Sequence, residues 1–159
     1  MIAASLVDGL AQRGWSLALA ESCTGGLIAS AVTEVPGSSA VFGLGIVSYS
    51  YAAKEQLLGV PSSLLLKHGA VSEPCVVAML DGVNKLSQAT LCAAVTGIAG
   101  PGGATPDKSV GTVWTALSHG SSRWVRVHHF DGDRSSVRDQ TVEVVLKGLS
   151  QVMEGVAPW

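Results

Sequence analysis

The chain has 159 residues, the length of one ordinary domain, and hydrophobic residues make up 47% of it against 14% charged residues. This composition excludes a disordered, collagen-like or charge-rich coiled-coil protein. The formal net charge of −2 argues against a surface that neutralises many nucleic-acid phosphates, so we expect no nucleic-acid partner.

The three cysteines indicate a reducing compartment. Cys23, Cys75 and Cys92 are far apart and form no C-x-x-C pair, so we expect free thiols and no bound metal. No secretory signal and no apolar run of membrane-spanning length is found, which predicts a cytoplasmic location and no membrane partner. High hydrophobicity with few charges predicts exposed apolar surface, and therefore a homo-oligomer.

The first third of the chain alternates helices and strands. Apolar residues at helical spacing predict a helix over residues 2–13, and residues 15–20 form a short apolar run typical of a buried strand. A polar segment, residues 21–26, then leads into a second predicted helix over residues 27–35. Residues 42–51 are rich in β-branched and aromatic types, which predicts another strand.

The remaining elements continue this pattern and end in a hairpin and a helix. They are short helices over 52–58 and 62–67, a helix opened by Ser72 with Pro74 in its first turn, a strand over 90–95, strands over 111–118 and 123–130, and a last helix N-capped by Asp133. The sum predicts one layered α/β domain with a mixed sheet.

Two glycine-rich segments follow predicted strands and invite an anion. Residues 21–26 place hydroxyls and backbone N–H groups at a helix start, where the helix dipole adds positive charge. Residues 96–103 leave a strand with glycines that let a ligand approach the backbone. Neither matches a P-loop or a dinucleotide fingerprint. Two such segments at sheet ends favour a shared pocket over two unrelated turns.

Candidate nucleophiles are Ser22, Ser39 and Cys23, although a cysteine here is more often a small buried hydrophobe. The four histidines lie in a turn, at a helix end or on an edge strand, which argues against a histidine-based triad. Lys54 follows a strand end in apolar surroundings, and a desolvated lysine could act as general base toward a serine. The alternative is a solvated lysine on a helix face.

Two arginines flank the start of the last helix. Arg134 and Arg138 could each hold a carboxylate or phosphate, or lie on the surface opposite Asp133 and Asp139.

Taken together, these segments resemble the C-terminal domain of the competence/damage-inducible CinA proteins, which also occurs alone as a nicotinamide mononucleotide deamidase. The resemblance rests on AESCTGG (20–26), PGSS (36–39), VSYS (47–50), LGV (58–60), HGAVSEP (68–74), TGIAGP (96–101), VGTVW (110–114) and FDGDR (130–134), with Lys54 and Arg138. These motifs cover nearly the whole chain in order.

The resemblance implies a three-layer α/β/α sandwich, a single domain over residues 1–159, and a homo-oligomer. It implies that nicotinamide mononucleotide, the small-molecule partner, is hydrolysed to nicotinate mononucleotide and ammonia without metal or cofactor. By motif, Lys54 is the general base and the nucleophile is Ser22 or Ser39. Ser22 occupies a junction typical of serine hydrolases, whereas a phosphate bound beside it would leave Ser39 to attack.

The resemblance also implies substrate-binding residues. Tyr49 and Thr96 are expected to orient substrate or handle a proton, and Arg134 or Arg138 to bind its anionic group. In the first glycine-rich segment, Glu21, Thr24, Gly25 and Gly26 are expected to contact the substrate. In the second, Gly97 and Gly100 are expected to do so, with backbone N–H groups stabilising an oxyanion.

Two other functions remain open on sequence grounds. One is a module that binds the same nucleotide without hydrolysing it, and the other is a purely structural oligomerisation domain. Ser22, Ser39 and Lys54 favour the enzyme, and the two polar glycine-rich segments argue against a purely structural role.

Overall fold

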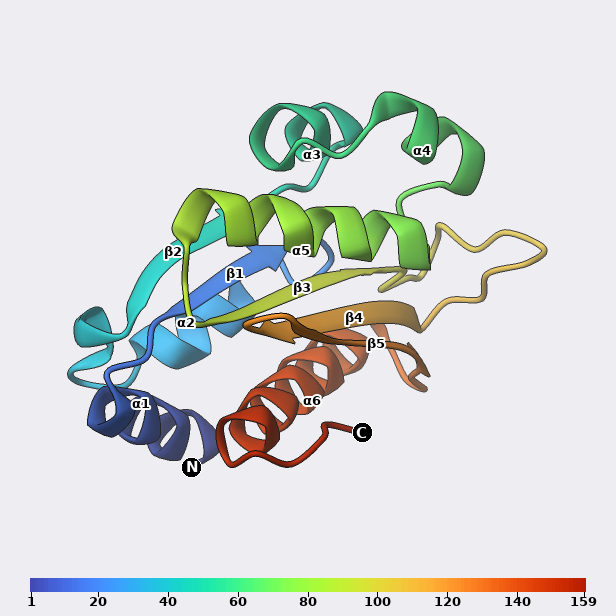
Figure 1. The fold of residues 1–159 in the computed structure, drawn as a ribbon. Helices are drawn as coiled ribbons and strands as arrows, with labels where there is room; N and C mark the ends of the chain where they lie inside the picture. Colours follow the sequence, from blue (N-terminus) through green and yellow to red (C-terminus); the bar gives the residue numbers. More distant parts are fainter.

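The computed structural model describes residues 1–159, and Figure 1 shows its arrangement. In chain order the elements are α1 (Ile2–Arg13), β1 (Leu17–Glu21), α2 (Leu27–Thr33), the 3-10 helix η1 (Ser38–Ala40), β2 (Phe42–Val47), α3 (Tyr51–Leu58), α4 (Ser62–His68), α5 (Glu73–Ser87), β3 (Leu91–Gly97), β4 (Thr112–His119), β5 (Ser122–His129) and α6 (Arg134–Met153). The predicted elements are all present.

The five strands form one mixed sheet in the order β2-β1-β3-β4-β5. β1 runs parallel to both β2 and β3, whereas β4 is antiparallel to its two neighbours. The carboxyl ends of β1, β2 and β3 therefore meet at one edge of the sheet, where ligands of open α/β sheets commonly bind.

Helices cover both faces of the sheet, so the predicted three-layer α/β/α sandwich is confirmed. Figure 1 shows α3, α4 and α5 on one face and α1, α2 and α6 on the other. Each face has its own apolar core, and the central strands β1 and β3 are buried along almost their whole length because both of their faces are covered. No helix combines the length and apolarity needed to cross a bilayer.

Local capping explains where three helices begin. The side chains of Ser50, Ser72 and Asp133 accept hydrogen bonds from backbone N–H groups in the first turns of α3, α5 and α6. The predicted caps at Ser72 and Asp133 are thus confirmed. The strand predicted over residues 42–51 is shorter, because it ends at Val47 and Ser50 already caps the next helix.

A close contact fixes α3, the helix that carries Lys54. Gly82 of α5 lies against the backbone at Leu58, the last residue of α3, and a Cβ at position 82 would collide with the Leu58 carbonyl. A glycine is required here for the two helices to approach. The position of Lys54 over the sheet therefore depends on a packing contact made well outside the site.

Candidate active site

A cavity of about 290 Å³ opens at the carboxyl ends of β1 and β3. This volume is close to the lower end of the range of small-molecule pockets, roughly 300–1,000 Å³. Its polar lining comes from segments far apart in the chain, namely Ser22, Tyr49, Lys54, Thr96, Arg134 and the glycines of the β3–β4 loop. No carboxylate lines this cavity, and the Arg134 guanidinium gives it a positive charge.

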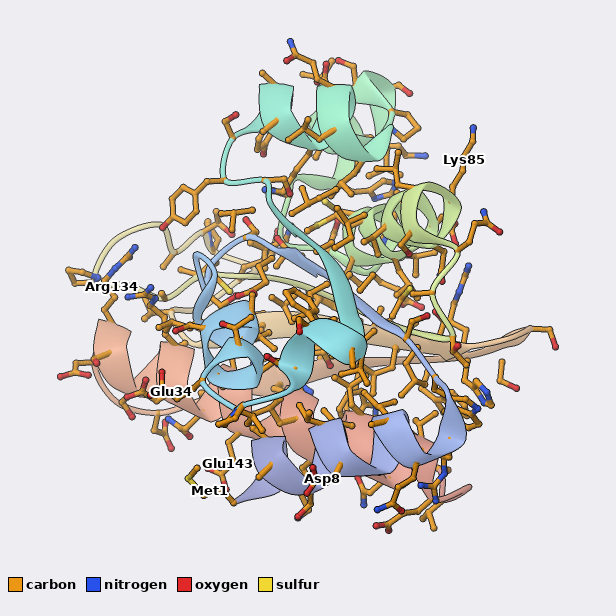
Figure 2. The ribbon with its side chains drawn as sticks, turned by 90° about the vertical axis from the view of Figure 1, so that its left-hand side faces the viewer. Met1, Asp8, Glu34, Lys85, Arg134 and Glu143 are labelled. Carbon is orange, nitrogen blue, oxygen red and sulfur yellow. The ribbon has the colours of Figure 1, made fainter.

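A larger hollow of about 560 Å³ lies on the outer side of α5. Its charged lining residues are Asp81 and Lys85, and both side chains are exposed. Figure 2 shows Lys85 extending away from the body of the protein. This hollow contains no nucleophile and no buried base, so the smaller cavity is the candidate active site.

Lys54 and Ser22 are in direct contact at the floor of the smaller cavity. Lys54 is only 1% exposed, and its Nζ lies 2.8 Å from Ser22 Oγ. The same Nζ donates to the backbone carbonyl of Ser48 at 2.6 Å. A buried amine within hydrogen-bond distance of a serine hydroxyl is the geometry that a serine–lysine pair requires.

The burial of Lys54 favours its neutral form. Desolvation lowers the pKa of Lys54 below its ordinary value of 10.5, outweighing smaller opposing effects of Cys75 and Cys23. No carboxylate pairs with Lys54, so no opposite charge offsets the cost of burying its ammonium form. A neutral amine has a lone pair that can accept the Ser22 proton, and the alternative of a solvated helix-face lysine is wrong.

Ser39 lies at the other end of the sheet. It belongs to η1, which precedes β2, and its residue is exposed. Lys54 follows the carboxyl end of the same strand, so the length of β2 separates the two residues. Within one chain the structure brings Ser22, and not Ser39, to Lys54.

Cys23 lines the cavity beside Ser22, but its environment keeps the thiol protonated. Burial raises the pKa of Cys23 to about 12, and the nearby Lys54 and Arg138 lower it too little to compensate. Because the thiolate is the reactive form of cysteine, this residue is a poor nucleophile at neutral pH.

The expected phosphate site at the start of α2 is already filled by a side chain of the protein itself. The buried Glu21 carboxylate accepts hydrogen bonds from the Thr24 hydroxyl at 2.6 Å and from the N–H groups of Gly26, Ile28 and Ala29 at 2.8–3.1 Å. The Gly25 N–H is bonded to the Ser22 carbonyl.

The prediction that Glu21, Thr24, Gly25 and Gly26 bind substrate stays a prediction, and the structure gives it no support. None of the four lines the cavity. The internal carboxylate takes the helix-start donors and compensates the positive end of the α2 dipole, so the segment serves to hold the loop that carries Ser22.

The second glycine-rich segment is open to a ligand. Gly97 and Gly100 line the cavity, together with Ala99, Gly102 and Gly103. The N–H groups of Ala99, Gly100, Gly102 and Gly103 lie outside helices and strands and make no hydrogen bond within the protein. Thr96 also lines the cavity, although its hydroxyl donates to the Ala70 carbonyl at 2.9 Å. The four unpaired backbone N–H groups are therefore suited to bind an anionic oxygen.

Of the two arginines, Arg134 reaches the cavity. Figure 2 places it at the first turn of α6, where the β3–β4 loop passes. Its guanidinium donates to the Gly100 carbonyl and to the Tyr49 hydroxyl, each at 2.7 Å. Arg138 lies one turn further along α6, does not line the cavity, and donates to the Thr24 carbonyl at 3.1 Å. The structure thus separates a cavity residue from one that holds the Ser22 loop.

Two contributors to the site were missed by sequence reasoning. The Ser48 carbonyl holds Lys54, and Ala70 and Val71 line part of the cavity. A backbone carbonyl and small apolar residues carry no residue-type signal beyond the VSYS and HGAVSEP motifs that contain them.

The comparison with known proteins identifies the family and agrees with the fold. Residues 1–153 match the family model of the CinA C-terminal domain. The chain belongs to this family. A CinA-like protein of Akkermansia muciniphila is 49% identical over 146 residues, and a CinA-like protein of Thermotoga maritima is 44% identical over 146 residues. These matches cover 91% and 92% of the chain but 35% and 36% of the relatives, so the chain spans about a third of their length.

Solved structures of CinA superfamily proteins share the fold over nearly the whole chain. A CinA superfamily protein of Klebsiella pneumoniae has a TM-score of 0.92 at 34% identity, with 97% of this chain and 96% of that chain covered. A competence/damage-inducible protein of Agrobacterium tumefaciens has a TM-score of 0.88 at 38% identity, covering 96% and 93%. This CinA C-terminal domain is therefore an α/β fold of the CinA superfamily.

Proposed function

We propose that this CinA C-terminal domain hydrolyses the carboxamide of nicotinamide mononucleotide to nicotinate mononucleotide and ammonia. The observation that carries the proposal is the 2.8 Å contact between Lys54 Nζ and Ser22 Oγ inside a cavity with positive fixed charge. The substrate comes from the resemblance to the CinA family, and the reaction type from the serine–lysine geometry.

The first half of the reaction forms an ester. Neutral Lys54 takes the Ser22 proton as Oγ bonds to the carboxamide carbon, and the carbonyl oxygen becomes an oxyanion. The unpaired N–H groups between Ala99 and Gly103 are the donors that stabilise this charge. Each such donor typically lowers the activation barrier by about 2.7–4 kcal/mol. The Lys54 ammonium then gives its proton to the departing nitrogen, the carbon–nitrogen bond breaks, and ammonia leaves.

The second half uses water in place of serine. Lys54, neutral again, takes a proton from a water molecule that attacks the ester carbon, and returns a proton to Ser22 Oγ as the carbon–oxygen bond breaks. The products are a carboxylic acid, which ionises, and the restored enzyme. Arg134 is suited to the substrate phosphate, because its guanidinium is a charged hydrogen-bond donor at the cavity wall.

The decisive experiment is an ammonia-release assay on the purified chain with nicotinamide mononucleotide. We expect turnover in the wild type and a loss of about 10³-fold or more in Ser22→Ala and in Lys54→Met. The control is Ser39→Ala, which is expected to retain activity because Ser39 lies at the opposite end of β2. Binding of nicotinamide mononucleotide without ammonia release would overturn the proposed hydrolysis and favour a nucleotide-binding module.

We also propose that the chain self-associates next to the cavity. Four exposed large apolar side chains, Val47, Tyr49, Tyr51 and Leu57, lie between the end of β2 and the end of α3. Light scattering of the purified chain tests this directly, since a mass near 16.2 kDa at micromolar concentration would rule it out.

A further inference from the structure

Ser48 carries the one buried hydroxyl without a hydrogen-bond partner in the protein. Ser48 is 0% exposed, and its own backbone carbonyl accepts a hydrogen bond from Lys54 Nζ at 2.6 Å. Buried hydroxyls are normally paired, so an unpaired one beside a candidate base requires an explanation.

The main chain of Ser48 is held by hydrogen bonds, whereas no hydrogen bond holds its side chain in one rotamer. Its N–H donates to the Glu21 carbonyl at 2.8 Å, which continues the β1–β2 pairing, and its own carbonyl is held by Lys54. Rotation about χ1 therefore moves Oγ among its staggered positions without moving the backbone.

Neutral Lys54 has one N–H group without an acceptor, just as Ser48 has one hydroxyl without a partner. A neutral amine has two N–H groups and one lone pair, and Nζ has two partners, Ser22 Oγ and the Ser48 carbonyl. Once Ser22 has given up its proton and bonded to carbon, the ammonium has three N–H groups and Ser22 Oγ is a weaker acceptor. An additional acceptor beside Nζ would stabilise the charge at this stage.

We propose that the Ser48 hydroxyl accepts a hydrogen bond from the Lys54 ammonium during catalysis. This role rests on the proposed serine–lysine reaction and makes Ser48 a positioning residue, because it acts through Lys54 and does not line the cavity. The other titratable groups around Lys54 are Cys23 and Cys75, with Tyr49 and Arg134 on the cavity wall. None of them is a carboxylate, so no other side chain compensates the ammonium.

The test is the pH profile of kcat/KM for Ser48→Ala. Removing an acceptor disfavours the Lys54 ammonium, so Lys54 stays neutral to lower pH. The acidic limb of the kcat/KM profile therefore moves to lower pH. We expect a shift of about one unit, the size of a hydrogen bond to a charged group, and a kcat reduced about tenfold. Ser48→Thr retains the hydroxyl and should return the limb toward that of the wild type.

The matched control is Ser38→Ala, which removes the hydroxyl of another largely buried serine residue at the opposite end of β2. It should leave the limb in place. A Ser48→Ala enzyme with an unchanged limb and unchanged kcat, and with equal or greater thermal stability, would show that the hydroxyl is only an unpaired group and would overturn the proposal.

A second measurement separates this proposal from the proposed function. NMR titration of the Lys54 Cε signal, assigned with Lys54→Met, reports the lysine pKa without any turnover. A lower Lys54 pKa in Ser48→Ala than in the wild type supports the contact. It does so even if the wild type releases no ammonia, because the absence of ammonia release would overturn only the proposed function. An equal pKa in the two proteins overturns the contact.

Discussion

The two junctions at the carboxyl ends of β1 and β3 are both rich in glycine, but their backbone N–H groups are used differently. After β1, the Glu21 carboxylate accepts hydrogen bonds from the start of α2, so the junction is closed from within. After β3, the N–H groups of Ala99, Gly100, Gly102 and Gly103 have no partner in the protein and line the cavity. A glycine-rich junction thus indicates an anion site only where no internal acceptor occupies its donors.

The closed junction supplies rigidity and the open one supplies donors. Ser22 follows Glu21 directly, so the hydrogen bonds that fix the carboxylate also fix the backbone of Ser22, the proposed nucleophile. The open junction has no comparable anchor of its own, and Arg134 holds it at the Gly100 carbonyl. Four changes test this division of roles.

Glu21→Gln should have the largest effect on stability. The amide keeps one acceptor but places an NH₂ group against backbone N–H donors, and it removes the charge at the α2 start. We expect a loss of about 3 kcal/mol in the free energy of unfolding, measured by urea denaturation. Glu34→Gln, an exposed change at the other end of α2, is the control and should be nearly neutral. Equal stabilities for the two variants would show that the closed junction contributes little.

Lys54→Met should change how stability depends on pH. In the wild type the folded-state pKa of Lys54 is lowered by burial, so between that value and 10.5 the unfolded chain binds one more proton than the folded one. Stability therefore rises with pH in this window, by up to about 1.4 kcal/mol per pH unit.

The methionine variant lacks this contribution. The wild-type minus Lys54→Met difference in unfolding free energy should increase between pH 7 and 10, as measured by denaturation at each pH. A difference that stays constant with pH would mean that Lys54 is charged in the fold, and would remove it as a base.

Arg134→Gln should weaken substrate binding at the open junction. It removes two 2.7 Å hydrogen bonds and a positive charge from the cavity wall, so we expect KM for nicotinamide mononucleotide to rise about tenfold, with a smaller change in kcat. Arg138→Gln is the matched control, because Arg138 lies outside the cavity. A larger rise in KM for Arg138→Gln would reverse the assignment of the two arginines.

Gly103→Ala should have the smallest effect, about 1 kcal/mol or a few-fold in KM. Gly103 has a φ of 93°, which strains any residue with a Cβ, and a Cβ there would lie 3.3 Å from the Ile98 side chain. Gly102→Ala is the control in the same loop, since a Cβ at 102 meets no atom within 4 Å. If both variants bind substrate equally, the conformation at Gly103 is not needed for the open junction.

Much of this fold follows from local sequence signals. The caps at Ser72 and Asp133, the strand–turn–strand pattern around residues 118–122 and the helical spacing of α1 and α6 depend on neighbouring residues, so a single sequence is sufficient to predict them. The boundary between β2 and α3 was less predictable, because the residues between Val47 and Ser50 suit a strand as well as a cap.

For the site, the sequence by itself supplied Ser22, Lys54 and two candidate junctions, because residue type and position after a strand are visible in one dimension. Only the tertiary structure placed Ser22 rather than Ser39 beside Lys54 and Arg134 rather than Arg138 at the cavity, and only it showed that Glu21 closes the first junction. These choices depend on which end of a parallel sheet a residue occupies and on which donors are already bonded. Both are set by pairing between distant strands and by side-chain direction, which no local pattern encodes.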